Sequence, residues 1–210
     1  YFNSEQDVED IFTTILGCEK AVIAPTMMGF FDWSALHCSN AGTFGEAYRK
    51  LEPAAIWDMD KRTSWNTHYK AIYLTNFLHE NQFRFKNISQ ERIDFWLAQA
   101  DFVKALMYFR LAQDWGEAVV APSTEDASQQ AKSPINTILT EAIQAAEAAL
   151  ILPTFDKLTN AQGNNINSRQ YASLGTVHTL LANIYAWMGG LYDKEEYWKK
   201  AEASASLVIE

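Results

Sequence analysis

Apolar residues recur at steps of three and four along most of the chain, which places them on one face of an α-helix. The first such segment opens with Ser4 and Asp7, a pair typical of a helix start, and its period continues to about Lys20. A second helix is predicted over residues 65–81. The residues expected on one face of this helix are Trp65, Tyr69, Ile72, Asn76 and His79.

The segment from about Gln90 to Asp114 carries two apolar stripes instead of one. Ser89 is the expected cap and Glu91 lies in the first turn, where a negative charge favours the helix dipole. One stripe consists of Trp96, Ala100, Val103, Met107 and Leu111, and the other of Ala98, Phe102, Ala105, Phe109 and Ala112. A helix that is apolar on two faces needs neighbours on both sides, as in a stack of helices.

Three more helices are expected in the second half of the chain. Ser133 and Pro134 predict a helix start, with Ser133 as the cap, and that helix should end before Pro153. Another helix is predicted from about Leu174, ended by Gly189-Gly190, and a last one over residues 196–209. Residues 117–132 read as a polar connector whose short apolar run should lie on the protein surface.

These segments predict an all-α fold, because no window alternates apolar and polar residues for long enough to form a strand. The last two helices have a tetratricopeptide-like spacing, which indicates a solenoid of two-helix repeats. The residues that carry this spacing are Leu181, Ala182, Tyr185, Gly189, Tyr197, Ala201, Ala205 and Val208. We therefore expect residues 1–210 to form a single α-helical domain.

Residues 29–62 are predicted to be a long irregular loop within this domain. Most connections in compact domains have about four to six residues, so a loop of this length favours a functional role. Protein–sugar sites combine aromatic faces with hydrogen-bonding side chains, and the loop is rich in both. Its candidate ligand-binding residues are Phe31, Asp32, Trp33, Asn40, Tyr48, Arg49 and Trp57. The alternative is a loop held by its own aromatic rings, or one that packs on a partner.

Composition and charge narrow the classes of function. Hydrophobic residues make up 48% of the chain and charged residues 20%, which is typical of a globular protein. The net charge of −9 and the lack of a basic run argue against nucleic-acid binding. No apolar stretch is long enough to span a membrane, and the start at Tyr1 suggests a removed leader or a trimmed sequence. Cys18 and Cys38 lack a metal-binding spacing, and we favour two free thiols.

The sequence also argues against catalysis and cofactors. The four histidines form no zinc-binding motif, and a packed or exposed helix histidine is the simpler interpretation of His68 and His79. Nucleophile-elbow, phosphate-loop and dinucleotide motifs are all missing. Carboxylates are numerous, but no pair that could act across a glycosidic bond can be assigned from the sequence. We expect no enzyme activity, no metal and no cofactor.

Three segments in order resemble the SusD/RagB family of nutrient-binding proteins. They are WNTHYKAIYLTN at 65–76, AQADFVKALMYFRLAQDWGEAVVAP at 98–122, and a final block that runs from YASLGTVHTLLANIYAWMGG to YWKKAEASASLVIE. The opening YFNSEQDVEDIF is similar to the family's first helix. The chain departs from the family pattern at Phe102-Val103-Lys104-Ala105, where arginine is common, and after Gly116, where Glu-Ala-Val-Val replaces a segment ending in Val-Pro.

The resemblance implies a function and a cellular place. Family members are non-catalytic lipoproteins on the outer-membrane surface of Bacteroidetes, seated on a SusC-like TonB-dependent transporter, to which they deliver glycans or sometimes peptides. They place binding residues in the connection after the first helix, and they continue well beyond the length seen here. The chain is thus expected to be an amino-terminal portion that meets the membrane only through an upstream lipid anchor.

One alternative remains at this stage. A generic tetratricopeptide-like adaptor for a peptide or protein partner would have the same helical spacing. An upstream signal segment ending in a lipidated cysteine would favour the nutrient-binding function over the adaptor.

Overall fold

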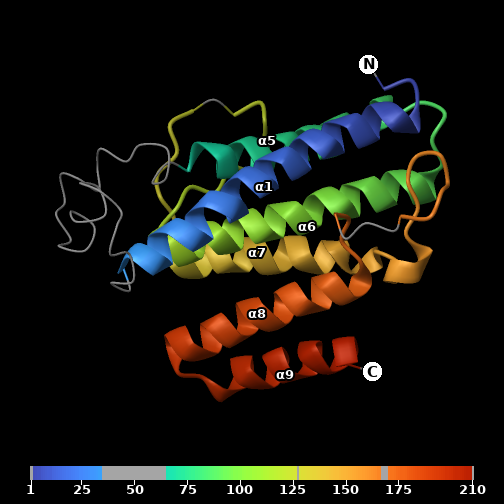
Figure 1. Cartoon of the computed structure of the whole chain (residues 1–210). Coiled ribbons are helices and arrows are strands. Elements are labelled where there is room, and N and C mark those ends of the chain that lie inside the picture. Colours follow the sequence, from blue (N-terminus) through green and yellow to red (C-terminus); the bar gives the residue numbers. More distant parts are fainter. Residues whose placement is uncertain (1, 35–64, 127, 167–169, 210) are drawn as a thin grey trace.

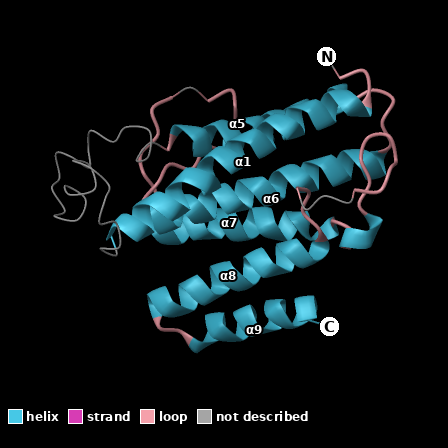
Figure 2. Ribbon diagram, in the orientation of Figure 1, coloured by secondary structure: helices cyan, strands magenta, loops and turns pink. Residues whose placement is uncertain are grey.

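The structure is a computed structural model that describes residues 2–34, 65–126, 128–166 and 170–209; within α1, only the backbone of residues 24–34 is described. Throughout these residues the elements are helical, and none of them is a strand (Figure 2). The α-helices are α1 (Glu5–Ser34), α5 (Asn66–Asn81), α6 (Gln90–Trp115), α7 (Ile135–Ala148), α8 (Leu174–Tyr192) and α9 (Glu195–Ile209). The short 3-10 turns are η1 (Gln82–Arg84), η2 (Ala149–Ile151) and η3 (Phe155–Lys157).

The helices form three successive layers: α1 with α5, α6 with α7, and α8 with α9 (Figure 1). The layers are joined because α6 also packs on α1 and α5, and α7 packs on α8. This stack of helix pairs confirms the all-α class predicted from the sequence.

Helix α6 lies at the centre of the stack. Its first turn is capped by Ser89, whose Oγ accepts a hydrogen bond from the backbone N–H of Arg92 at 3.3 Å. It ends at Gly116, where φ is +72°, a conformation that favours glycine. Both predicted stripes are buried except for Phe102, which is half-buried. The sequence prediction of two packed faces is confirmed.

The connector between α6 and α7 is tied to the helices by two tyrosines. Tyr69 Oη donates to the carbonyl of Val119 at 2.8 Å and accepts from the N–H of Val119 at 2.7 Å. Tyr108 Oη accepts from the N–H of Ala121 at 3.1 Å. Ala118 is fully buried. The apolar run therefore lies against α5 and α6, and Ala118 is buried there instead of lying on the protein surface as predicted.

Helix α1 starts where the sequence predicted but ends later. The Asp7 carboxylate accepts from the N–H and the hydroxyl of Ser4 at 2.8 and 3.0 Å, and the helix begins at Glu5. The backbone stays helical to Ser34, whereas the periodicity predicted an end near Lys20. The predicted loop boundary at residue 29 is therefore wrong. A helix does not need a continuous apolar stripe where its backbone hydrogen bonds remain intact.

Two predicted boundaries in the second half need correction. Ser133 does not cap α7: the residue at the cap position is Pro134, and the backbone of Ser133 instead pairs with Ala118 through hydrogen bonds of 2.7 and 3.3 Å. Gly189 and Gly190 do not end α8. The helix continues to Tyr192 and stops at Asp193, which is left-handed with φ of +51°.

A polar clamp joins α1, α6 and the segment before α8. Glu5 Oε1 accepts from Arg92 Nε at 2.6 Å and from Trp96 Nε1 at 2.8 Å. Glu9 accepts from the hydroxyl of Tyr171 at 2.7 Å and from the N–H of Ala161 at 3.1 Å. Both carboxylates are therefore paired, which offsets the cost of their partial burial.

The thiol of Cys18 is free and buried, and burial raises its pKa. Cys38 lies outside the described residues.

Candidate functional site

The predicted ligand-binding residues lie at the end of α1 and in the segment between α1 and α5. Phe31, Asp32 and Trp33 lie on the last turns of the α1 backbone. Asn40, Tyr48, Arg49 and Trp57 lie outside the described residues. Contact between these seven residues and a ligand stays a prediction.

The structure does place the two ends of this connection. Helix α1 ends at Ser34 and α5 begins at Asn66, and the two helices pack on each other. Both ends lie on the left-hand side of the stack in Figure 1. Ser34 and Asn66, the helix ends on either side of the predicted loop, thus lie at one end of the stack.

Aromatic rings gather where the chain re-enters at α5. We call this group the Trp65 cluster, and it consists of Trp65, His68, Tyr69, Trp115 and Lys132. The ring centroids of Trp65 and Trp115 lie 6.2 Å apart, and the Tyr69 ring meets Trp65 edge-on at 5.6 Å. Lys132 Nζ lies 5.4 Å from the centre of the Trp65 ring, within the range of a cation–π contact.

His68 forms the floor of the cluster. Its side chain is 1% exposed and meets the Trp115 ring edge-on at 5.2 Å. Neither ring nitrogen has a hydrogen-bond partner in the structure. Burial, with a smaller effect from the Arg110 guanidinium, lowers the pKa of His68 to about 4. The imidazole is therefore neutral at physiological pH and packs as a flat ring.

The rim of the cluster is polar and partly open. Trp65 and Trp115 are both half-buried, so that part of each ring remains accessible. Arg110 Nη1 donates to Gln113 Oε1 at 2.9 Å, and burial of the carboxyl group raises the pKa of Asp114, one residue before Trp115. Accessible indole surface beside charged hydrogen-bonding groups can stack on the C–H face of a sugar and bond its hydroxyls.

Sequence reasoning placed Trp65 on a helix face but did not find Trp115 or Lys132 as its neighbours. The available signal for Trp115 was its position directly before the helix-ending Gly116, at an open helix terminus. No sequence signal places Lys132 near Trp65, because the contact depends on how the connector folds back.

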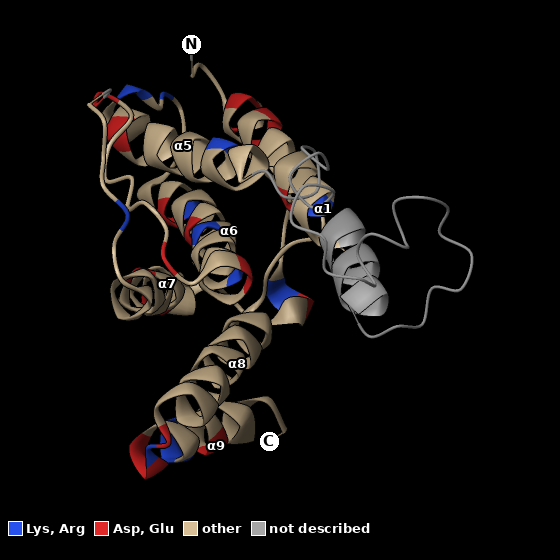
Figure 3. Ribbon diagram, turned by 90° about the vertical axis from the view of Figure 1, so that its left-hand side faces the viewer, with Lys and Arg blue, Asp and Glu red and all other residues tan. Residues whose placement is uncertain are grey.

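Metal-ligand groups, surface charge and membrane-spanning length can be described for the same residues. Within that part of the chain, no three of His, Cys, Asp and Glu could together hold a metal ion. His79 is used otherwise, since its Nε2 lies 2.7 Å from Asp101 Oδ1. Lysines and arginines lie scattered among carboxylates over the helices (Figure 3). None of the helices, so far as they are described, is long and apolar enough to cross a membrane.

Solved structures with the same fold come from the SusD superfamily. The chain aligns over its whole length with a SusD homolog and with a SusD superfamily protein, both from Bacteroides thetaiotaomicron, at TM-scores of 0.76 and 0.80 and 18% identity. It covers 41% and 48% of these two proteins. A laminarin-binding SusD-like protein aligns with 99% of the chain at 15% identity and a TM-score of 0.70, over 44% of its own length. The chain thus spans less than half the length of these structures.

The sequence itself supports the same assignment. A search of curated protein sequences gave no match. A family model described as "Starch-binding associating with outer membrane" matches residues 32–160, which is more than half of the chain. Together with the fold, this match confirms the resemblance found in the sequence, and the chain belongs to the SusD-like family of carbohydrate-binding proteins.

Proposed function

We propose that the chain is the amino-terminal part of a non-catalytic cell-surface protein that captures glycans and delivers them to a TonB-dependent transporter. The observation that carries the proposal is the family match over residues 32–160. This range includes residues 32–62 of the predicted binding connection and the helices α5, α6 and α7 that follow it.

The Trp65 cluster supports a sugar as the ligand. It supplies two half-buried indoles and a lysine at Trp65, where the chain re-enters the described fold after the connection that carries the candidate residues. Aromatic faces with a few polar groups are the usual chemistry of small-molecule sites that bind sugars. A connection that brings Trp33 and Trp57 toward this cluster would extend one aromatic surface.

The transporter, the lipid anchor and the extracellular location belong to the longer protein. The family description supports an association with the outer membrane. Co-purification of the full-length protein with an outer-membrane channel from the native host tests the delivery step. Recovery of the protein without any such channel, under conditions that preserve membrane complexes, would contradict it.

Glycan capture is tested on the full-length protein with a glycan array, followed by calorimetric titration of the best ligand. We expect Trp33→Ala to weaken binding by about 2 kcal/mol, the cost of losing a stacking anchor. Trp187→Ala is the matched control, because Trp187 is 39% exposed and lies on α8, in a different layer from α1, where it packs against Phe109. We expect this control to leave affinity unchanged.

A thermal melt of each variant separates binding from folding. Unchanged affinity of Trp33→Ala together with a large drop in melting temperature would make Trp33 structural. The ligand site would then have to be sought at Trp57 or the Trp65 cluster. The absence of any array signal from the full-length protein would count against glycan capture itself.

A further inference from the structure

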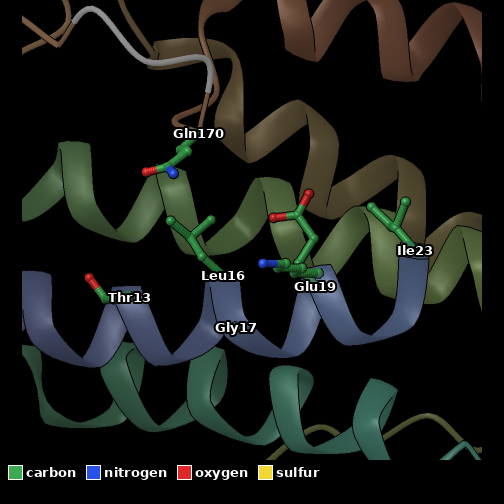
Figure 4. A pocket seen from close by; sticks show the side chains of 7 residues that line it. Thr13, Leu16, Gly17, Glu19, Ile23 and Gln170 are labelled. Atoms are coloured by element: carbon green, nitrogen blue, oxygen red, sulfur yellow. The ribbon is translucent and has the colours of Figure 1, made fainter. Parts of the chain in front are cut away.

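A pocket of about 430 Å³ opens beside α1 and shares no residue with the Trp65 cluster (Figure 4). The described residues that line it are Thr13, Leu16, Gly17, Glu19, Lys20 and Ile23 of α1, with Gln170 from the segment before α8. In Figure 4, Leu16 lies between Gln170 and Glu19, and the Glu19 carboxyl group projects from α1. This volume is within the range of small-molecule sites.

Glu19 differs from the two glutamates that precede it on α1. Glu5 and Glu9 each accept two hydrogen bonds, as described above for the clamp. The Glu19 carboxylate has no such donor and no ion pair among the described residues. Its surroundings exclude enough water to raise its pKa to about 7. A desolvated carboxyl group without a partner is costly, and a bound hydrogen-bond donor would offset that cost.

Three of the polar groups that line the pocket share one property. A carboxyl group close to half-protonated at neutral pH, the amide of Gln170 and the hydroxyl of Thr13 can each donate and accept hydrogen bonds. Sugar hydroxyls also do both. Leu16 and Ile23 add apolar surface for the C–H face of a ring. Lys20 would repel a cationic ligand, and the ionised fraction of Glu19 would repel an anionic one. A neutral polyhydroxyl ligand therefore fits the charges of the pocket best.

We propose that this pocket is a second binding site, separate from the α1–α5 connection, for one or two units of a neutral sugar, with Glu19 as the central hydrogen-bonding residue. The choice of a sugar rests on the proposed function. The choice of neutral over charged ligands rests on the lining residues alone. Such a site would hold a glycan chain at a second point along the stack.

The experiment is an NMR titration of the ¹⁵N-labelled chain with single sugars. The neutral probes are glucose, galactose, mannose, xylose, N-acetylglucosamine and the disaccharides maltose and laminaribiose. Glucosamine and glucuronate are the charged probes. We expect at least one neutral probe to shift the amide signals of Gly17, Lys20 and Gln170, and to do so more strongly than either charged probe.

Two substitutions and a control make the assignment specific. Glu19→Leu removes the hydrogen-bonding group and should weaken binding at least about tenfold, the equivalent of one good hydrogen bond. Glu19→Gln keeps a group that donates and accepts, and should retain most of the affinity. Glu125→Leu changes an exposed glutamate on the connector and should have no effect. In a thermal melt, Glu19→Leu should be at least as stable as the unmodified chain, because it removes an unpartnered carboxyl group.

Three results would overturn the proposal. They are no shift at these amides with any neutral probe, shifts that survive Glu19→Leu, and a preference for glucosamine or glucuronate. If one of these results is found but the full-length protein binds glycans on the array, the pocket is not a sugar site and the proposed function still holds. If sugars bind in the pocket but the full-length protein binds no glycan on the array, the proposed function is contradicted and the pocket site still holds.

Discussion

Trp198 occupies the space that a side chain at position 189 would need. A Cβ atom added to Gly189 would lie 2.7 Å from Cε2 of the Trp198 ring, whereas one added to Gly190 meets nothing within 4 Å. Alanine normally stabilises a helix interior relative to glycine by about 1 kcal/mol, and overpacking costs about 1 to 3 kcal/mol. We therefore expect Gly190→Ala to raise the free energy of unfolding and Gly189→Ala to lower it.

The two variants differ by one position and by no other chemistry, so urea denaturation of both measures the close contact directly. We expect a difference of at least about 1 kcal/mol between them. Equal stabilities would mean that the half-exposed Trp198 ring moves aside freely, and that Gly189 is not needed for the packing of α9 on α8.

His68 makes the stability of the fold depend on pH. Its pKa is about 4 in the folded chain, below the ordinary value of about 6.5, so the fold favours the neutral ring. The contribution of neutral His68 to the free energy of unfolding is fully present above about pH 6.5. It is lost as the pH falls toward 4, because over this range the unfolded chain binds the proton more readily than the folded chain does. His68→Phe should remove this dependence.

The measurement is urea denaturation of both proteins at about pH 7.5 and about pH 4.5. On acidification His68→Phe should gain roughly 2 to 3 kcal/mol relative to the unmodified chain. Any constant packing difference between the rings cancels in this comparison. A relative stability that does not change with pH would show that water or movement relieves the burial of His68.

At the scale of elements, the structure separates a real helix cap from an apparent one. Ser173 accepts from the N–H of Thr176, and the Thr176 hydroxyl accepts in return from the N–H of Ser173, which forms a reciprocal capping box at α8. Ser133, which the sequence predicted as a cap, makes no side-chain cap for α7. Ser173→Ala should therefore cost about 1 kcal/mol, and Ser133→Ala should be close to neutral.

Thermal or urea unfolding of these two variants provides the check. An equal loss of unfolding free energy in Ser173→Ala and Ser133→Ala would show that Ser133 does cap α7. A neutral Ser173→Ala would mean that water replaces the side chain at the start of α8.

Local sequence signals predicted the elements whose causes are local. The start of α6 at Ser89, its end at Gly116 and its two buried faces all follow from residues within that helix. The predictions for the start of α7 and the end of α8 were wrong because contacts with residues distant in the sequence determine the structure there. Ser133 is held by the backbone of Ala118, and Gly189 is needed beside Trp198 instead of at a helix stop.

At the scale of the whole molecule, the predicted fold class is confirmed, but the site could be predicted only in part. The order of the motifs identified the family, and aromatic content pointed to the connection after α1. The Trp65 cluster escaped prediction because its members come from α5, the end of α6 and the connector, which meet only when the layers are stacked. Spacing within one helix carries no information on such contacts.

The stack should also be unevenly stable from one layer to the next. Helix α6 buries most of its residues between α1, α5 and α7, whereas the buried residue of α9 is Ala201 and its packing is on α8. In solenoids each layer is held by its neighbours, and elements with few buried contacts open locally at a lower free energy than the core. We expect native-state hydrogen exchange to show α9 amides exchanging first and α6 amides last.

Ala201→Asp sharpens this prediction, because a charge at the α8–α9 contact should release α9. Amide protection in α9 should then be lost while α6 keeps its own. Ala203→Asp, at an exposed position of the same helix, is the matched control and should leave both patterns unchanged. The opposite result would be that α9 and α6 exchange with the same free energy in the unmodified chain and lose protection together in Ala201→Asp. The three layers would then unfold as one cooperative unit, and the layer-by-layer description of this stack would be wrong.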